Sequence, residues 1–186
     1  MKLDTTTPFY RLLDTKYDED REEEAIAILT AHPELAKESW SGPDEQGKPF
    51  IKGSTALHYA ANDGKVQLMQ LLIDYGADVN AANANWYATP LSWAANNAEL
   101  EAIRLLITNG ADPNGPNVLH AAAYGGSSCG AEEPEQYIAA VQLLIEKGAD
   151  INSRKYYQNQ TPLTVAIGSG NRWVADYLRS IGAKEK

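Results

Sequence analysis

The sequence lacks long apolar runs, and it has a single cysteine, Cys129, among 186 residues. One cysteine excludes an intramolecular disulfide, which is typical of a protein in a reducing compartment. No stretch approaches 18 consecutive apolar residues, so no membrane-spanning helix is predicted. The N-terminal residues MKLDTTTPFYRLLD have no apolar segment behind the lysine and do not resemble a secretory signal. A cytoplasmic protein without a membrane partner is expected.

Basic residues are also scarce. Lys and Arg number 16 against 25 Asp and Glu, which gives a formal net charge of −9. Nucleic-acid binding depends on clustered Lys and Arg, and no such cluster is present, so a nucleic-acid partner is not expected. The negative charge favours solubility, and it would also accelerate association with a basic protein.

The motifs of catalytic, cofactor and metal sites are missing as well. No Gly-rich phosphate loop, CxxC pair or HExxH element occurs. Cys129 has small and acidic neighbours, without the Lys, Arg or His that lowers the pKa of a reactive thiol. Glu132 and Glu133 lie in a polar segment that lacks the burial needed to shift a carboxyl pKa. We therefore expect no enzyme, no cofactor and no metal.

Two short strings recur along the chain in the same phase. Gly-Ala-Asp begins at residues 76, 110 and 148, each time after a Leu-Leu-Ile block, and a frayed copy begins at residue 182. Upstream of each block, a second string reads TALHYAA at 55–61, TPLSWAA at 89–95, NVLHAAA at 117–123 and TPLTVA at 161–166. Two independent strings in one phase indicate an internal repeat.

Each repeat reads as two helices. The threonine that opens the second string can cap a helix, and a proline suits the position after it (Thr55, Thr89 and Thr161; Pro90 and Pro162). Small alanines then allow close approach of neighbouring helices. The next helix has apolar residues at helical spacing and ends at a glycine that favours a left-handed backbone (Gly76, Gly110, Gly148 and Gly182).

These strings are similar to the ankyrin-repeat pattern Thr-Pro-Leu-His…Leu-Leu…Gly-Ala-Asp-x-Asn, strongly over residues 53–186 and weakly over 5–50. The resemblance implies an all-α solenoid of stacked helix-turn-helix units with projecting hairpin loops, in one domain spanning 1–186. The approximate repeats are 5–50 (an N-terminal cap), 51–83, 84–114, 115–153 and 154–186 (a C-terminal cap). It also implies that His58 and His120 are structural hydrogen-bonding groups between adjacent repeats.

Several segments depart from this pattern. The weak first repeat is predicted to hold two helices, at 7–16 and 18–30. Residues 41–49 are rich in turn formers and are expected to form a loop, whereas the hairpin after Asp112 is short because the next inner helix follows within a few residues. An insertion at 127–136 is small, polar and acidic, so we expect a surface loop, which is either neutral or part of a functional face.

The resemblance places hairpin tips and inner helices on a continuous concave face. Large aromatic residues there are typical of binding hot spots, although they could instead pack one tip against the next. The candidate partner-binding residues are Phe50, Ile51, Trp86, Tyr87, Asn96, Asn97, Tyr124, Tyr156 and Tyr157. For Tyr59 and Trp93, packing is the preferred interpretation.

The sequence therefore predicts a monomeric protein-interaction module that acts as an inhibitor, immunity factor or adaptor. The alternative is an enzyme or small-ligand binder with a pocket between aromatic inner helices and the 127–136 insertion. That pocket would be lined by Tyr59, Trp93, His120 and Tyr124.

Overall fold

The computed structural model describes residues 8–13, 19–41, 50–84, 87–125, 134–154 and 157–185. Within them the chain is all-α, as predicted, with two short 3-10 helices, η1 (Pro33–Lys37) and η2 (Tyr157–Asn159). The α-helices are α1 (Pro8–Leu13), α2 (Glu19–Ala31), α3 (Ala56–Asn62), α4 (Val66–Asp74), α5 (Pro90–Asn96), α6 (Leu100–Thr108), α7 (Val118–Tyr124), α8 (Pro134–Glu146), α9 (Pro162–Gly168) and α10 (Arg172–Ser180). The predicted N-terminal helix pair is confirmed over residues 8–13 and 19–31, and the rest of the predicted first helix lies outside the described residues.

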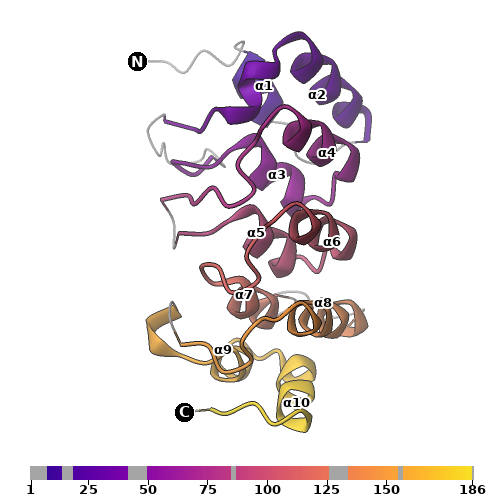
Figure 1. Cartoon of the computed structure of the whole chain (residues 1–186). Helices are drawn as coiled ribbons and strands as arrows, with labels where there is room; N and C mark the ends of the chain where they lie inside the picture. The colour runs from indigo at the N-terminus through magenta and orange to yellow at the C-terminus, as the bar shows by residue number, and fades with distance from the viewer. Residues whose placement is uncertain are drawn as a thin grey trace.

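The helices stack in pairs along the length of the molecule (Figure 1). Odd-numbered helices form an inner layer and even-numbered helices an outer layer, and the loops project on the inner side (Figure 1). We number these hairpins by the repeat that they open. Hairpin 2 (residues 39–54) precedes α3, hairpin 3 (78–88) precedes α5, hairpin 4 (112–117) precedes α7 and hairpin 5 (150–160) precedes α9.

Side-chain caps start two inner helices as the sequence predicts. Thr89 Oγ1 accepts a hydrogen bond from the Ser92 N–H at 3.3 Å, and Thr161 Oγ1 accepts one from the Thr164 N–H at 3.2 Å. Both helices then begin with proline, whose missing N–H would have had no helical partner. The glycines that end the outer helices have positive φ angles of 87° to 97° (Gly76, Gly110, Gly148 and Gly182).

One core runs through the stack between the two layers. The leucine of each inner-helix motif is buried (Leu57, Leu91, Leu119 and Leu163), as is the middle leucine of each outer helix (Leu72, Leu106, Leu144 and Leu178). Burial of each such side chain contributes about 2 kcal/mol. Buried alanines between the inner helices, such as Ala61 and Ala95, permit the close stacking that the sequence predicts.

Asparagine side chains join consecutive repeats at the base of the hairpins. Asn80 Nδ2 donates to the Gly110 carbonyl at 3.0 Å, while its Oδ1 accepts from the Asp112 N–H at 3.0 Å. The equivalent Asn114 and Asn152 also bond to the repeat that follows. Each amide therefore acts as a cross-link, because it satisfies backbone groups of the next repeat.

The fourth repeat departs most from its neighbours. Hairpin 4 reaches α7 at Val118, only eight residues after Gly110, whereas α5 and α9 begin 14 residues after Gly76 and Gly148. The predicted short hairpin is therefore confirmed, and its loop projects less than its neighbours (Figure 1). The predicted 127–136 loop needs a correction, because α8 begins at Pro134 and includes its last three residues. The rest of that insertion, and residues 42–49, lie outside the described residues.

Candidate functional site

His58 links the inner layer to the next hairpin. Its Nε2 lies 3.1 Å from the carbonyl oxygen of Ala88 in hairpin 3, so this nitrogen carries the proton and donates. Its Nδ1 accepts from the Thr55 N–H at 3.1 Å. Burial lowers the pKa of His58 to about 4, the main cause being loss of solvation of the charged form. The neutral imidazole is therefore a structural group, as the sequence predicts.

His120 plays the same part for hairpin 5. Its Nε2 donates to the Gln160 carbonyl at 2.8 Å, and burial again lowers the pKa of the imidazole. The equivalent positions in the other two repeats are Ser92 and Thr164. Ser92 Oγ instead donates to the Thr89 carbonyl of its own repeat at 2.8 Å. Among these four repeats, a histidine thus stands before each full-length hairpin, and a serine stands before the short hairpin 4.

A row of aromatic contacts supports the first half of the inner layer. Phe50 packs between Trp40 and Tyr59, with ring centroids 5.2 and 5.5 Å away, and Tyr59 meets Trp93 edge-to-face at 5.1 Å. Phe50 is only 4% exposed, so the expectation that it stands at a solvent-facing tip is corrected. Its ring fills the space between two repeats. The packing interpretation of Tyr59 and Trp93 is confirmed.

Some of the candidate residues near the ends of the inner helices already form hydrogen bonds within the protein. Asn97 Nδ2 donates to Asn62 Oδ1 at 2.7 Å, which ties α5 to α3. Asn96 is half-buried beside it. Ile51 is half-buried, and its N–H donates to the Tyr59 hydroxyl at 3.0 Å. Tyr124, at the end of α7, is 44% exposed and remains available to a partner.

Tyr87 is the most exposed large apolar side chain among the described residues, at 70%. It also has a left-handed backbone, with a φ of 55°. The equivalent position in hairpin 2, also two residues before the threonine that caps the inner helix, is Gly53, with a φ of 82°. A bulky residue in this conformation costs about 1 kcal/mol relative to glycine. An exposed ring recovers little of that cost through packing.

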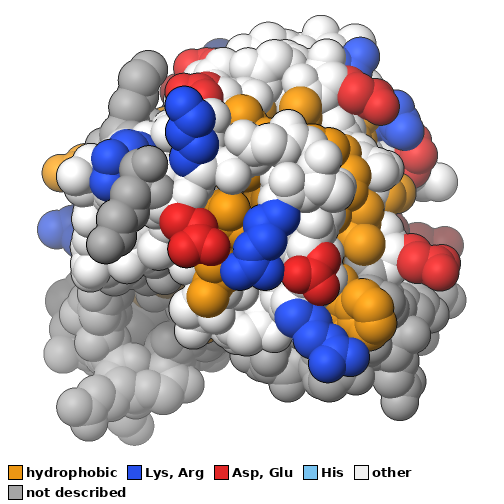
Figure 2. All heavy atoms as spheres, turned by 90° about the horizontal axis from the view of Figure 1, so that it is seen from below, with side chains coloured by type: hydrophobic (Ala, Val, Ile, Leu, Met, Phe, Trp, Pro, Cys, Tyr) orange, Lys and Arg blue, Asp and Glu red, His pale blue; other side chains and the backbone are white. Residues whose placement is uncertain are grey.

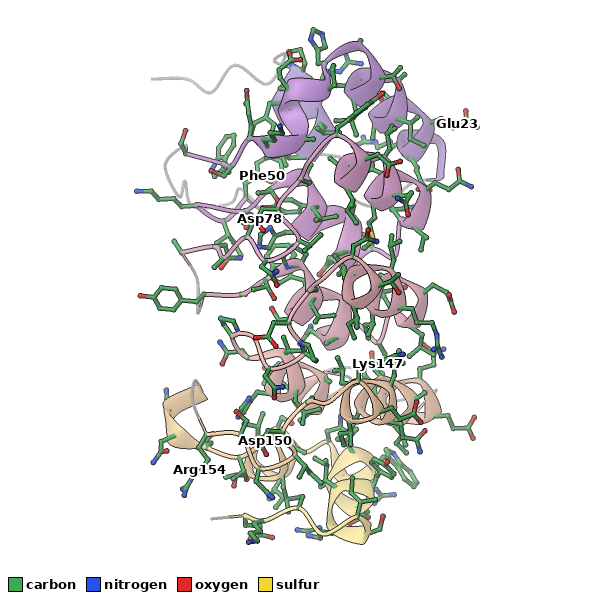
Figure 3. All side chains as sticks on the ribbon, in the orientation of Figure 1. Glu23, Phe50, Asp78, Lys147, Asp150 and Arg154 are labelled. Atoms are coloured by element: carbon green, nitrogen blue, oxygen red, sulfur yellow. The ribbon has the colours of Figure 1, made fainter. Side chains whose placement is uncertain are left out.

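The remaining candidates lie outside what the structure describes. Trp86 and Tyr156 are not among the described residues, nor is the side chain of Tyr157. Their neighbour Arg154 is exposed, and its Nε donates to the Asn159 carbonyl at 3.1 Å within hairpin 5. Arg154 projects on the same side of the stack as Asp78, whereas Glu23 lies on the opposite, outer side (Figure 3).

Among the described residues, the charged side chains form no metal-binding cluster. No group of three or more His, Cys, Asp or Glu side chains is placed to hold a metal ion in that part of the chain. Burial raises the pKa of Glu99, with a further contribution from Asp63 and an opposing one from Lys65. Glu99 lies in the turn after α5, at the opposite end of that helix from the hairpin. Among the described helices, none has the length and apolar character required to cross a membrane.

The repeat architecture agrees with a comparison against known families. The model of ankyrin repeats (3 copies) matches residues 24–117 and again 91–185. The chain belongs to the ankyrin-repeat family. Ankyrin repeats are generally protein–protein interaction modules, and the family is typically non-enzymatic.

One similar protein is the ankyrin repeat and KH domain-containing protein mask-1 of Caenorhabditis elegans. It is 28% identical over 177 residues, which cover 84% of this chain. The chain spans only 6% of the length of that relative, so the similarity concerns an ankyrin segment within a much larger protein.

The ankyrin scaffold brings two exposed candidates, Tyr87 and Tyr124, to the inner side of neighbouring repeats. They lie before α5 and at the end of α7. Sequence analysis missed the asparagine cross-links, although Asn80, Asn114 and Asn152 recur two residues after the Gly-Ala-Asp aspartate. It also missed the backbone strain at Tyr87, which an alignment of the hairpins would have shown as a tyrosine opposite Gly53.

Proposed function

We propose that this ankyrin protein binds a partner protein through its inner helices and hairpins, with Tyr87 as a central contact. The observation that carries the proposal is the combination of 70% exposure and a φ of 55° at Tyr87. Selection for stability alone would favour glycine there, as in hairpin 2. A tyrosine that lowers stability and leaves its ring in solvent is explained by binding, because tyrosine is enriched at interface hot spots.

We further propose that the protein acts as a monomer in the cytoplasm, as an inhibitor, immunity factor or adaptor. A basic partner fits the net charge of −9 best. Attraction between unlike net charges accelerates association and weakens as salt is added. We therefore expect the association rate with the partner to fall as ionic strength rises, and a rate independent of salt would contradict a basic partner.

Replacement of Tyr87 by glycine tests the proposed face. We expect the free energy of unfolding of the Tyr87→Gly variant to be about 1 kcal/mol higher than that of wild type, because the backbone strain is released. The same variant should bind the partner about 30-fold more weakly, as at a hot spot. The partner would first be isolated from native cell extract on the wild-type protein and identified by mass spectrometry, and affinities would then be measured by calorimetry.

Ala98→Gly is the matched control. Ala98 also has a left-handed backbone, with a φ of 56°, but it is buried in the turn after α5, away from the hairpins. This variant should gain stability and keep full affinity. If Tyr87→Gly instead lost stability and kept its affinity, the ring would have a structural role and the proposed face would be rejected.

A further inference from the structure

The outer helix α10 carries exposed apolar side chains that the outer helix of the third repeat lacks. Counted back from the glycine that ends each helix, Trp173 stands where α6 has Glu101. By the same count, Ile181 corresponds to Asn109. Trp173 and Ile181 are 44% and 41% exposed, and the half-buried Tyr177 lies between them. These three residues are four positions apart, so they line one side of the helix over about 12 Å, and we call them the outer stripe.

The outer stripe lies away from the residues that attach α10 to the stack. Val174, Ala175 and Leu178 are the buried residues of this helix. On an α-helix, the direction of Trp173 differs from the centre of these three by about 150°. Because the core lies between the two layers, the outer stripe is on the side of the molecule opposite the hairpins, where Figure 1 shows α10. A partner bound there would not compete with a partner on the inner face.

Folding does not account for the composition of the outer stripe. The second repeat forms the equivalent helix α4 with Gln67 at the position of Trp173. Exposed apolar residues that adjoin one another mark interaction sites, and tryptophan, tyrosine and arginine are the residues most enriched at binding hot spots. The outer stripe supplies the first two of these residue types, and its neighbour Arg172 supplies the third.

Arg172 also places a positive charge at the edge of the outer stripe. Its guanidinium lies 4.8 Å from the centroid of the Trp173 ring, so the aromatic ring holds the cation beside the stripe. Arg104 and Arg179, on α6 and α10, lie 3.7 and 3.1 Å from a carboxylate. Arg172 forms no ion pair within the described part of the chain. Its charge is therefore available to a carboxylate of another molecule.

We propose that the outer stripe docks an acidic amphipathic helix of a second partner protein. The outer layer consists of helices that pack side by side, α6 against α8 and α8 against α10, and a further helix would lie along α10 in the same way. Its apolar residues, three or four positions apart, would pack on Trp173, Tyr177 and Ile181, and an Asp or Glu beside them would pair with Arg172. This inference goes beyond the proposed function, because a protein with two separate docking surfaces holds two partners at once, as an adaptor does.

The test selects ligands without presupposing a helix or a charge. A phage-displayed library of random 16-residue peptides would first be depleted on the Trp173→Gln/Ile181→Asn variant and then selected on wild type. Both substitutions introduce residues that other repeats have at these positions, Gln67 and Asn109, so the variant should fold. Thermal unfolding would confirm this, and Trp173→Gln alone would take its place if the double variant did not fold.

The selected peptides would be synthesised and titrated against wild type and single variants. We expect them to share an Asp or Glu beside apolar residues three or four positions apart, and to lose binding when a central residue is replaced by proline, which breaks a helix. Trp173→Gln should weaken binding about 30-fold, as at a hot spot. Arg172→Gln should weaken it about fivefold at low salt and less at high salt. The matched control, Arg104→Gln, removes an equal charge from α6 and should bind as wild type does.

Each contrary outcome overturns a stated part of the proposal. If no peptide is enriched after depletion, the outer stripe is not a docking surface. Peptides that tolerate a central proline would overturn the helix, and peptides that bind Arg172→Gln as tightly as wild type would overturn the acidic partner. A wild-type dimer in analytical ultracentrifugation that Trp173→Gln abolishes would identify a second copy as the occupant and overturn the second partner. The inner face is judged by the Tyr87→Gly affinity, so the two proposals fail independently.

Discussion

The second and third repeats share the same pair of helices, and three of the equivalent positions at which they differ concern the hairpin and the turn between the helices. His58, Gly53 and Gly64 of the second repeat correspond to Ser92, Tyr87 and Ala98 of the third. Two of these differences follow from the neighbour. The second repeat meets the full-length hairpin 3, which accepts the His58 bond and packs against Gly53. The third meets the short hairpin 4, so neither a histidine nor a glycine is required there. The residue at these two positions is thus set by the length of the following hairpin.

At the C-terminal end of the described stack, the outer surface of the fifth repeat differs from that of the second. Arg172 and Arg179 of α10 are exposed where α4 has the half-buried Val66 and Ile73. Seen from that end, basic and acidic side chains alternate with apolar ones (Figure 2). A polar outer surface on a terminal repeat keeps a solenoid soluble. Three apolar residues of this repeat are exceptions, since Ile167, Trp173 and Ile181 are 41%, 44% and 41% exposed, and Ile167 stands where α3 has the buried Ala61.

Removal of the His58 imidazole should produce the largest difference between the two repeats. His58→Ala should destabilise the protein by about 4 kcal/mol, because it leaves a cavity and an unbonded Thr55 N–H in the core. Ser92→Ala, at the equivalent position, should cost about 1 kcal/mol, since it removes only a local cap. Urea unfolding of both variants measures the difference. Equal losses would show that the bond to hairpin 3 adds nothing.

Acid should weaken the second repeat through the same group. The pKa of His58 is about 4 when folded against an ordinary value of 6.5, so the unfolded chain binds more protons between these pH values. The contribution of His58 to the free energy of unfolding is therefore constant above about pH 6.5 and falls by about 3 kcal/mol as the pH drops to about 4. The lowered pKa of His120 acts in the same direction, whereas the raised pKa of Glu99 acts in the opposite one.

A His58→Gln variant isolates this contribution, because glutamine does not titrate. Urea unfolding of wild type and variant at several pH values should show the variant losing less stability than wild type below pH 6.5. Identical pH profiles would contradict the assignment.

Substitution at Gly53 tests the other half of the comparison. Gly53→Ala should cost about 2 kcal/mol, because its φ of 82° disfavours a side chain and its Cβ would press on Asn83 and Ala84 of hairpin 3. Urea unfolding of the two single variants should show opposite changes in stability, a loss for Gly53→Ala and a gain for Tyr87→Gly. A neutral Gly53→Ala would mean that hairpin 3 can move away, and that its contact with hairpin 2 is loose.

Sequence alone predicted the elements whose cause is local. Thr89, Pro90 and Gly76 act through their own backbone, so their neighbours in sequence were sufficient to place the helix ends. Phe50 was misplaced because its surroundings in sequence are turn formers, while its packing partners Trp40 and Tyr59 come from elsewhere in the chain. The exposure of Tyr87 likewise depends on hairpin 4, which begins more than 20 residues later. Apart from the His58 and His120 bonds, what sequence reasoning missed was the contact between repeats.

The third difference, Gly64 against Ala98, depends on the turn itself and not on a hairpin. Both residues follow an inner helix with a left-handed backbone, at φ angles of 63° and 56°. Ala98→Gly should therefore stabilise the protein by about 0.5 kcal/mol, since released strain exceeds the loss of one buried methyl group and the added freedom of the unfolded chain. The gain, measured by urea unfolding, should be the same in wild type and in a variant whose hairpin 4 is lengthened by replacing residues 112–117 with a copy of residues 150–161. A gain that changed with hairpin length would show that the neighbouring hairpin also governs this turn, and the comparison would then rest on one cause instead of two.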